Sequence, residues 1–307
     1  MNPAYSVILF TTASGAGYGL LALLGLVGFN HGPVSNFAFG LVAIVVALGL
    51  ITVGLLSSTF HLGHPERAWR AFSQWKSSWL SREGVASVVT YVPAVLFGAT
   101  WLDIVHAPAW IGPLGLATAT MCAVTVFCTA KIYSTLKTVR AWNHPLVVPI
   151  YLAFAAASGG ALLTAIATIF GRFQIFQVIL TVVALLWLIG LKFFYWRAID
   201  NAARTHTMAA ATGLGQGVRQ WEVPHTSENY IMKEMGFAVA RKHALKLRNA
   251  VFLLMFITLV ALAACLLSPW FSFIAAPAIL LAAVVERWLF FAEAQHVVSL
   301  FYGAEKA

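Results

Sequence analysis

Eight runs of mainly apolar residues constrain the fold of this chain more than any other feature. They cover residues 5–28, 37–59, 84–104, 113–134, 147–170, 175–196, 250–270 and 272–295. A helix needs about 20 apolar residues to cross the hydrocarbon core of a bilayer, and it satisfies its own backbone hydrogen bonds there. The sequence therefore predicts an all-α integral membrane protein, with residues 1–307 forming one domain of eight transmembrane helices. His-Pro dipeptides at 64–65 and 144–145 are compatible with two related four-helix halves.

The low share of charged residues excludes several other classes of protein. Asp, Glu, Lys and Arg make up 9% of the 307 residues, and hydrophobic residues make up 61%. Soluble domains carry about 25% charged residues, and disordered chains have low hydrophobicity. We therefore expect neither a soluble domain nor a nucleic-acid-binding protein, despite the net charge of +9. The three cysteines lie in apolar runs and form no ligand set for a metal or an iron–sulfur cluster.

The distribution of Lys and Arg predicts the orientation in the membrane. With eight spans, 18 of the 19 Lys and Arg residues fall at the end of the bundle that carries both termini and the loops 60–83 and 197–249. Arg172 alone falls at the other end. Because positively charged loops stay in the cytoplasm, we expect both termini and these two loops to be cytoplasmic.

The segment 197–249 is the one sizeable insertion outside the predicted spans. We expect it to continue the sixth span, break at the Gly-rich stretch 212–217 and form a helix from about Ser227 to Arg248, with Ser227 or Thr226 as its N-cap. No strand precedes the glycines and no GK[ST] follows them, so a flexible turn is favoured over a phosphate site. The basic end of the insertion suits anionic lipid headgroups or a partner protein.

The loop 60–83, FHLGHPERAWRAFSQWKSSWLSRE, is where chemistry is most expected. Its three Trp and four basic residues are typical of a membrane interface and of topology anchors. His61 lies at the end of the second span, where an apolar side chain would have a lower free energy of insertion into the membrane. Glu83 begins the third span, and an acid at the membrane edge needs either a cationic partner or a function. The loop therefore has two possible interpretations, a redox or proton-handling site and a purely structural membrane-interface segment.

The stretches HLGHPERAWRAF (61–72) and SSWLSREG (77–84) resemble the DmsC family, the membrane-anchor subunits of DMSO-reductase-type molybdoenzymes. Eight helices and about 300 residues match the family, so the resemblance covers essentially the whole chain. The segment SENYIMKEMGFAVARKHALKLR (227–248) also resembles the subgroup that contains the anchors of cytoplasmic sulfite dehydrogenases. The resemblance implies a three-subunit complex in the bacterial cytoplasmic (inner) membrane.

In that complex, molybdopterin and the [4Fe–4S] clusters belong to the two partners, a catalytic subunit and an iron–sulfur electron-transfer subunit. The anchor exchanges electrons with ubiquinone or menaquinone and carries no haem and no residue that is catalytic for the substrate. The resemblance assigns quinone binding to His61, Arg67 and Glu83. His61 would donate a hydrogen bond, Arg67 would stabilise negative charge on the quinone oxygens, and Glu83 would relay protons.

Tyr133 and Arg140, where the fourth span emerges, are further candidates for the pocket. For Tyr133 the alternative is an interfacial belt residue, since Tyr is enriched at the membrane edge.

Several alternatives for the function remain open. The cytoplasmic position of the 60–83 loop favours sulfite oxidation with quinone as the electron acceptor, whereas a DMSO or other respiratory reductase would oxidise quinol. A di-haem anchor needs facing pairs of His, and only His61 and His296 are expected at helix depth. A secondary transporter is suggested by Gly-rich stretches at 11–19 and 158–160, although such residues more often allow close helix packing.

The last span carries three charged residues, Glu286, Arg287 and Glu293. They can pair inside the bundle or line a proton path to the quinone site. We favour an internal ion pair over the relay.

Overall fold

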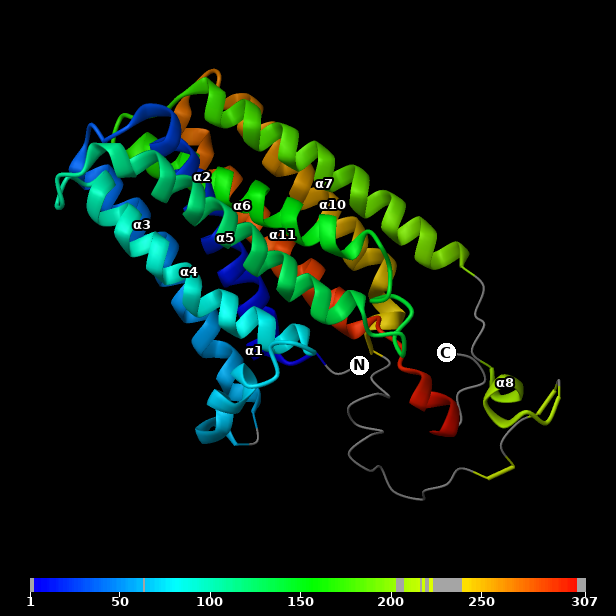
Figure 1. The fold of residues 1–307 in the computed structure, drawn as a ribbon. Helices are drawn as coiled ribbons and strands as arrows, with labels where there is room; N and C mark the ends of the chain where they lie inside the picture. Colours follow the sequence, from blue (N-terminus) through cyan, green and yellow to red (C-terminus); the bar gives the residue numbers. More distant parts are fainter. Residues whose placement is uncertain are drawn as a thin grey trace.

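The computed structural model describes residues 3–62, 64–202, 207–215, 217–218, 221–222 and 239–302, with the side chains of all but His61 and residues 239–242. Eight helical segments are long and apolar enough to cross a membrane, and no strand occurs in these residues. This confirms the predicted all-α membrane fold, which Figure 1 shows as one elongated bundle.

The first span is built from three consecutive pieces, α1 (Tyr5–Leu9), the π-helix η1 (Phe10–Ser14) and α2 (Gly15–His31). The other spanning helices are α3 (Phe37–Ser57), α4 (Trp79–Trp101), α5 (Pro108–Ser134), α6 (Val147–Ile169), α7 (Ile175–Asn201), α10 (Val239–Ala264) and α11 (Ser272–Ala292). Short helical turns lie between or after them: η2 (Ser58–His61), η3 (Pro65–Phe72), α8 (Met208–Thr212), η4 (Pro269–Phe271) and η5 (Val297–Tyr302).

Small residues let the first span pack at the centre of the bundle. A Cβ atom on Gly19 would overlap the carbonyl oxygen of Ala155 in α6, and one on Gly25 would overlap that of Gly115 in α5. Such close backbone approach is the usual role of glycine in membrane helices. The Gly-rich stretches 11–19 and 158–160 are thus helical and serve packing, so the unwound segments of a transporter are not found there.

The π-helix η1 brings hydroxyl groups into the interior. All five of its residues are buried. Thr12 Oγ1 donates to the carbonyl oxygen of Ile8 at 2.8 Å, and Ser14 Oγ donates to that of Phe10 at 2.6 Å. π-Helical turns are rare and often mark functional sites.

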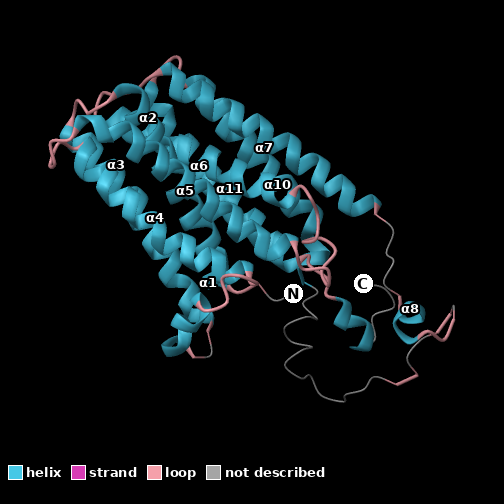
Figure 2. Ribbon diagram, viewed as in Figure 1, coloured by secondary structure: helices cyan, strands magenta, loops and turns pink. Residues whose placement is uncertain are grey.

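The connections gather at the two ends of the bundle. Figures 1 and 2 place the loop between α3 and α4, the loop between α5 and α6, α8 and η5 at one end. α7 extends to Asn201, as expected for the insertion, and Gly213 follows α8 in the left-handed conformation, with a φ of 71°. α10 begins at Val239, whereas Thr226 and Ser227, the predicted N-caps, lie outside the described residues.

Candidate functional site

The segment from Ser58 to Ser78, here called the HLG loop, folds back over the start of α4. Ser81 Oγ donates a hydrogen bond to the carbonyl oxygen of Ala71. The ring of Phe72 lies 3.3 Å from the position that a Cβ atom on Gly84 would take. The loop therefore covers the first turns of α4, which is the part of the helix that contains Glu83.

Arg67, the candidate residue of the loop whose side chain is described, is separate from Glu83. The side chain of Arg67 is 55% exposed, and its Nε lies 3.8 Å from Glu66 Oε1. At that distance and exposure the ion pair contributes little to stability. His61 ends η2, but its side chain lies outside the described part of the chain. Arg67 thus pairs with a neighbour on its own loop, and the structure does not bring it to Glu83.

Glu83 is buried, with 5% of its surface exposed. Thr129 Oγ1 of α5 donates a hydrogen bond to its Oε1 at 3.1 Å. Within the described residues this carboxylate has no ion pair. A charged carboxylate inside a membrane protein is costly unless it is paired. The arrangement therefore suits a side chain that takes up and releases a proton.

Tyr133 lies inside the bundle and not at the membrane edge. It is 9% exposed, and its ring centre lies 5.3 Å from Trp142, 5.5 Å from Phe290 and 6.0 Å from Tyr151. The interpretation of Tyr133 as a belt residue is therefore wrong. It belongs to an aromatic cluster between α5, α6 and α11.

Arg140 binds the end of α7. Its Nη1 donates to the carbonyl oxygen of Ala202 at 2.6 Å, and its Nη2 donates to that of Ile199 at 3.3 Å. Basic side chains often satisfy the free carbonyl groups at the C-terminus of a helix in this way. These hydrogen bonds connect the α5–α6 loop with the end of α7.

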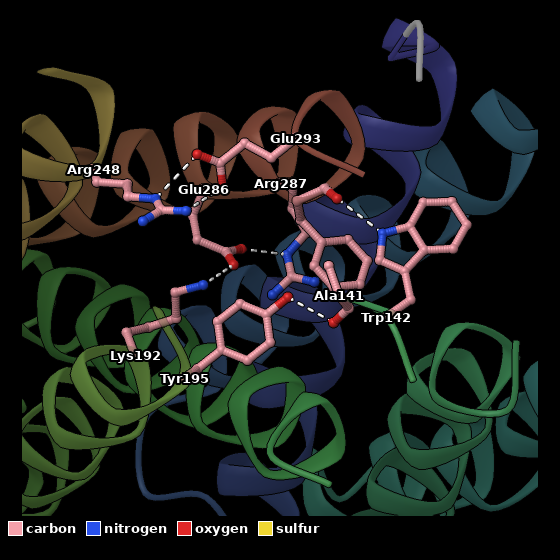
Figure 3. Close-up of polar contacts among 9 residues, drawn as sticks. Ala141, Trp142, Lys192, Tyr195, Arg248, Glu286, Arg287 and Glu293 are labelled. Atoms are coloured by element: carbon pink, nitrogen blue, oxygen red, sulfur yellow. Dashed lines mark hydrogen bonds and ion pairs between the residues drawn. The ribbon is translucent and has the colours of Figure 1, made fainter. Parts of the chain in front are cut away.

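Three charged residues from α7 and α11 meet inside the bundle, as Figure 3 shows. Lys192 Nζ lies 2.6 Å from Glu286 Oε1, and Arg287 Nε lies 2.8 Å from Glu286 Oε2. Their exposed fractions are 1%, 1% and 3% in the order Lys192, Glu286, Arg287. We call these three residues the buried ionic cluster. The predicted ion pair within the bundle is confirmed for Glu286 and Arg287.

The structure removes Lys192 from the loop charges that were counted to predict the membrane orientation. Its place next to the 197–249 loop suggests a topology residue, but it lies inside the bundle and pairs with Glu286. Its Nζ also lies 4.1 Å from the ring centre of Trp196, a cation–π distance. The sequence could have indicated this role, because a lone Lys within an apolar helix is rare unless it is paired or functional.

A small cavity of about 20 Å³ lies beside Arg287. Its lining includes Ser14, Tyr18, Thr129 and Tyr151. The hydroxyl groups of Tyr18 and Tyr151 and both Nη atoms of Arg287 are buried there without a hydrogen-bond partner among the described residues. The guanidinium carbon of Arg287 lies 3.7 Å from the centre of the Tyr151 ring. The residues around this cavity therefore carry several unpaired hydrogen-bonding groups. Thr129, which also lines the cavity, connects it to Glu83 by a hydrogen bond.

A larger cavity of about 400 Å³ lies at the end of the bundle where α7, α10 and α11 meet. Lys192, Arg248, Glu293 and Asp200 are among its lining residues. Arg248 binds Glu293 through two bonds of 3.0 and 3.1 Å and Asp200 through one of 2.8 Å. Burial raises the pKa of Glu293, although the hydrogen bonds from Arg248 oppose this shift.

The structure corrects the predicted position of His296. His296 follows α11, which ends at Ala292, and bridges Val139 in the neighbouring loop. Its expected position at helix depth is therefore wrong. Among the described residues, no group of three or more His, Cys, Asp or Glu side chains is arranged to hold a metal ion.

Comparison with known proteins places the chain in a family. Residues 1–304 match the DMSO reductase anchor subunit (DmsC) family. The chain is 32% identical over 334 residues to one of the sulfite dehydrogenase subunits of Allochromatium vinosum, with 98% of this chain and 99% of the relative covered. No solved structure matches the chain. The chain therefore belongs to the DmsC family of membrane-anchor subunits, whose partners in molybdoenzyme complexes are a catalytic subunit and an iron–sulfur subunit.

Proposed function

We propose that this chain is the quinone-reactive anchor of a three-subunit molybdoenzyme that oxidises sulfite on the cytoplasmic side of the bacterial inner membrane. Electrons pass from the iron–sulfur subunit to ubiquinone or menaquinone at this chain. The full-length similarity to a sulfite dehydrogenase subunit supports the substrate. The observation that carries the quinone site is the buried Glu83, which has a hydroxyl donor but no described ion pair, beneath the HLG loop.

The residues near the HLG loop fit the needs of a quinone. Its reduction consumes two electrons and two protons, so the protein must supply hydrogen-bond donors, positive charge and a proton carrier. His61 and the exposed Arg67 provide the first two, and Glu83 provides the third. Thr129 orients the Glu83 carboxylate through the bond to Oε1. We assign Tyr133 and Arg140 a supporting role, one in the aromatic cluster and one at the end of α7.

The HLG loop also offers a surface for the iron–sulfur subunit. Trp69 and Trp75 are 66% and 54% exposed on it, and Arg70 lies 5.7 Å from the ring centre of Trp69. Exposed Trp and Arg side chains are the residues most enriched at the energetic centres of protein interfaces. Docking at this loop would bring the terminal iron–sulfur cluster to the end of the bundle that holds Glu83.

The test is the binding of a fluorescent quinol analogue to membranes that contain the whole complex. We expect His61→Ala and Glu83→Gln to weaken binding or sulfite-dependent quinone reduction while the three subunits still copurify. Glu222→Gln, an exposed acid outside this loop, is the control and should leave both unchanged. Normal binding and normal turnover in both His61→Ala and Glu83→Gln would overturn the assignment of the site.

The family description supports one second candidate, an anchor that oxidises quinol for a DMSO reductase. The two functions differ in the direction of electron flow. Reduction of a quinone analogue by sulfite in the purified complex supports the first function, whereas oxidation of a quinol analogue by DMSO supports the second.

A further inference from the structure

We propose that the buried ionic cluster and the small cavity beside it form a proton route from the large cavity at the end of α7, α10 and α11 to Glu83. The inference rests on the proposed reduction of quinone near Glu83, which takes up two protons for every two electrons. It assigns a role in proton transfer to Lys192, Glu286 and Tyr151, which lie outside the sequence motif of the HLG loop.

The route begins at the large cavity. Lys192, Asp200, Arg248 and Glu293 all line it, and Figure 3 shows Arg248 and Glu293 on one side of the cluster. The Glu293 side chain is 16% exposed and binds Arg248 at the wall of this cavity. Lys192 is the residue that lines the cavity and also binds Glu286.

The cluster itself holds one exchangeable proton between two residues. Arg287 stays charged at every accessible pH, so the exchange takes place between the Lys192 ammonium and the Glu286 carboxylate, whose atoms lie 2.6 Å apart. Glu286 Oε2 lies at ion-pair distance from Arg287 Nε but lacks the direction of a hydrogen bond. After the carboxyl group turns, a proton received from Lys192 can therefore leave Glu286 toward a water molecule held by the Nη groups of Arg287, the cluster residue that lines the small cavity.

The small cavity continues the route toward Glu83. Its volume of about 20 Å³ fits one water molecule, which needs roughly 10–15 Å³ and two to four polar partners. Arg287, Tyr18 and Tyr151 supply such partners. Water and hydroxyl groups pass protons because each accepts one hydrogen bond while it donates another. Thr129 lines the same cavity and bonds Glu83 Oε1.

Aromatic rings cover the opposite approach to Glu83, and Arg82 and Lys131 lie against the Trp79 ring there. Phe72 packs over Gly84, and Trp79 lies edge to face with Phe127, with ring centres 5.9 Å apart. Thr129 is the one hydrogen-bond partner that the described residues give the Glu83 carboxylate. The hydrogen bond of the Glu83 carboxylate therefore leads into the bundle, toward Thr129 and the small cavity.

The test uses the whole complex in membranes, with Lys192→Met and Tyr151→Phe as variants. Lys192→Met leaves a neutral Glu286–Arg287 pair, and Tyr151→Phe keeps the ring under Arg287 but removes the hydroxyl. Each should slow sulfite-dependent quinone reduction about tenfold or more, because a positioned proton-transfer group contributes about 10²–10⁴-fold to a rate. The solvent deuterium isotope effect should rise, and binding of the quinol analogue should stay unchanged. Lys137→Met, an exposed Lys at the same end of the bundle, is the control.

The outcomes separate this inference from the proposed function. If Glu83→Gln stops turnover while Lys192→Met and Tyr151→Phe keep the wild-type rate and isotope effect, the proton route is wrong and the quinone site stands. If Glu83→Gln has no effect on turnover, the route loses its end point, and if His61→Ala also has none, the proposed site itself fails. If Lys192→Met prevents assembly, Tyr151→Phe alone decides.

Discussion

Among single residues, the charged side chains of the buried ionic cluster lie inside the bundle and pair with one another, unlike the exposed charged side chains of its loops. Glu286 is shared by two cations, Lys192 and Arg287, and none of the three has more than 3% of its surface exposed. Burying charges costs several kcal/mol per ion, and close pairing offsets this cost. The effect of removing one member therefore depends on which charges are left behind.

Glu286→Gln should be the most damaging change in the cluster. It leaves Lys192 and Arg287 as two unpaired buried cations, and breaking a buried pair costs about 3–5 kcal/mol. Lys192→Met leaves a neutral pair and should cost clearly less. Thermal unfolding of the complex in detergent measures the difference, with Glu222→Gln, an exposed acid, as the control. Equal losses for Glu286→Gln and Lys192→Met would contradict the charge argument.

Thr129→Val tests the hydroxyl group that binds Glu83. The two side chains have nearly the same shape, so the fold should persist while the bond to Glu83 Oε1 is lost. Hydrogen bonds to charged groups contribute about 1.5–3 kcal/mol, so quinone reduction should fall about tenfold or more. Thr120→Val is a matched control, because exposed Thr120 bonds to the carbonyl oxygen of Leu116, one turn earlier in α5. Equal activity in the two variants would remove Thr129 from the site.

At the scale of helices, close contacts of α2 with α5 and α6 hold the interior together. These contacts involve backbone atoms at Gly19, Gly25, Gly115 and Gly159. They place Tyr18 and Ser14 of the first span against Tyr151 and Ser158 of α6 around the small cavity. The close packing of these helices therefore determines which polar side chains meet around the small cavity.

Gly19→Ala should disrupt the bundle, whereas Gly49→Ala should not. The added Cβ atom at Gly19 would overlap backbone atoms of Ala155, which cannot move independently of α6. Nothing lies within 4 Å of the corresponding position at Gly49, so Ala there should be neutral or stabilising by up to about 1 kcal/mol. The yield and Tm of the detergent-purified complex provide the measurement. A stable Gly19→Ala protein would show that α2 and α6 are less tightly packed than described.

At the scale of the whole molecule, the orientation is still a prediction from charge. Lys192 and Arg287 are interior residues and no longer count toward it. By their place in the sequence, 16 of the other 17 Lys and Arg residues are still expected at the end opposite Arg172. We expect a fluorescent-protein fusion at the C-terminus to be active in the cytoplasm. We expect alkaline phosphatase inserted beside Arg172 to be active outside it. The reverse pattern would invert the topology and with it the assignment of sulfite oxidation to the cytoplasm.

The spans could be predicted from the sequence because hydrophobicity over about 20 residues is a local property. Glu83 and the Glu286–Arg287 pair were recognisable as charges within apolar runs. Tyr18, Thr129 and Tyr151 were not, because most hydroxyl groups in such helices bond to their own backbone, as Thr164 does with Gly160. Tertiary packing alone decides which hydroxyl faces a cavity. The predicted end of the last span lies three residues beyond Ala292, the last residue of α11, which put His296 close to the membrane.

The buried charges have a consequence for energy conservation, because Glu83, Glu286 and Arg287 lie toward one end of the bundle. Arg287 lies five residues before the end of α11, about 8 Å along the helix axis, and Tyr151 and Glu83 each lie four residues inside their helices at the same end. A proton that follows this path crosses little of the membrane potential, which acts with about 2.3 kcal/mol per charge and 100 mV. Quinone reduction by this complex should therefore be nearly electroneutral. Its rate in sealed vesicles should not change when an ionophore collapses the voltage.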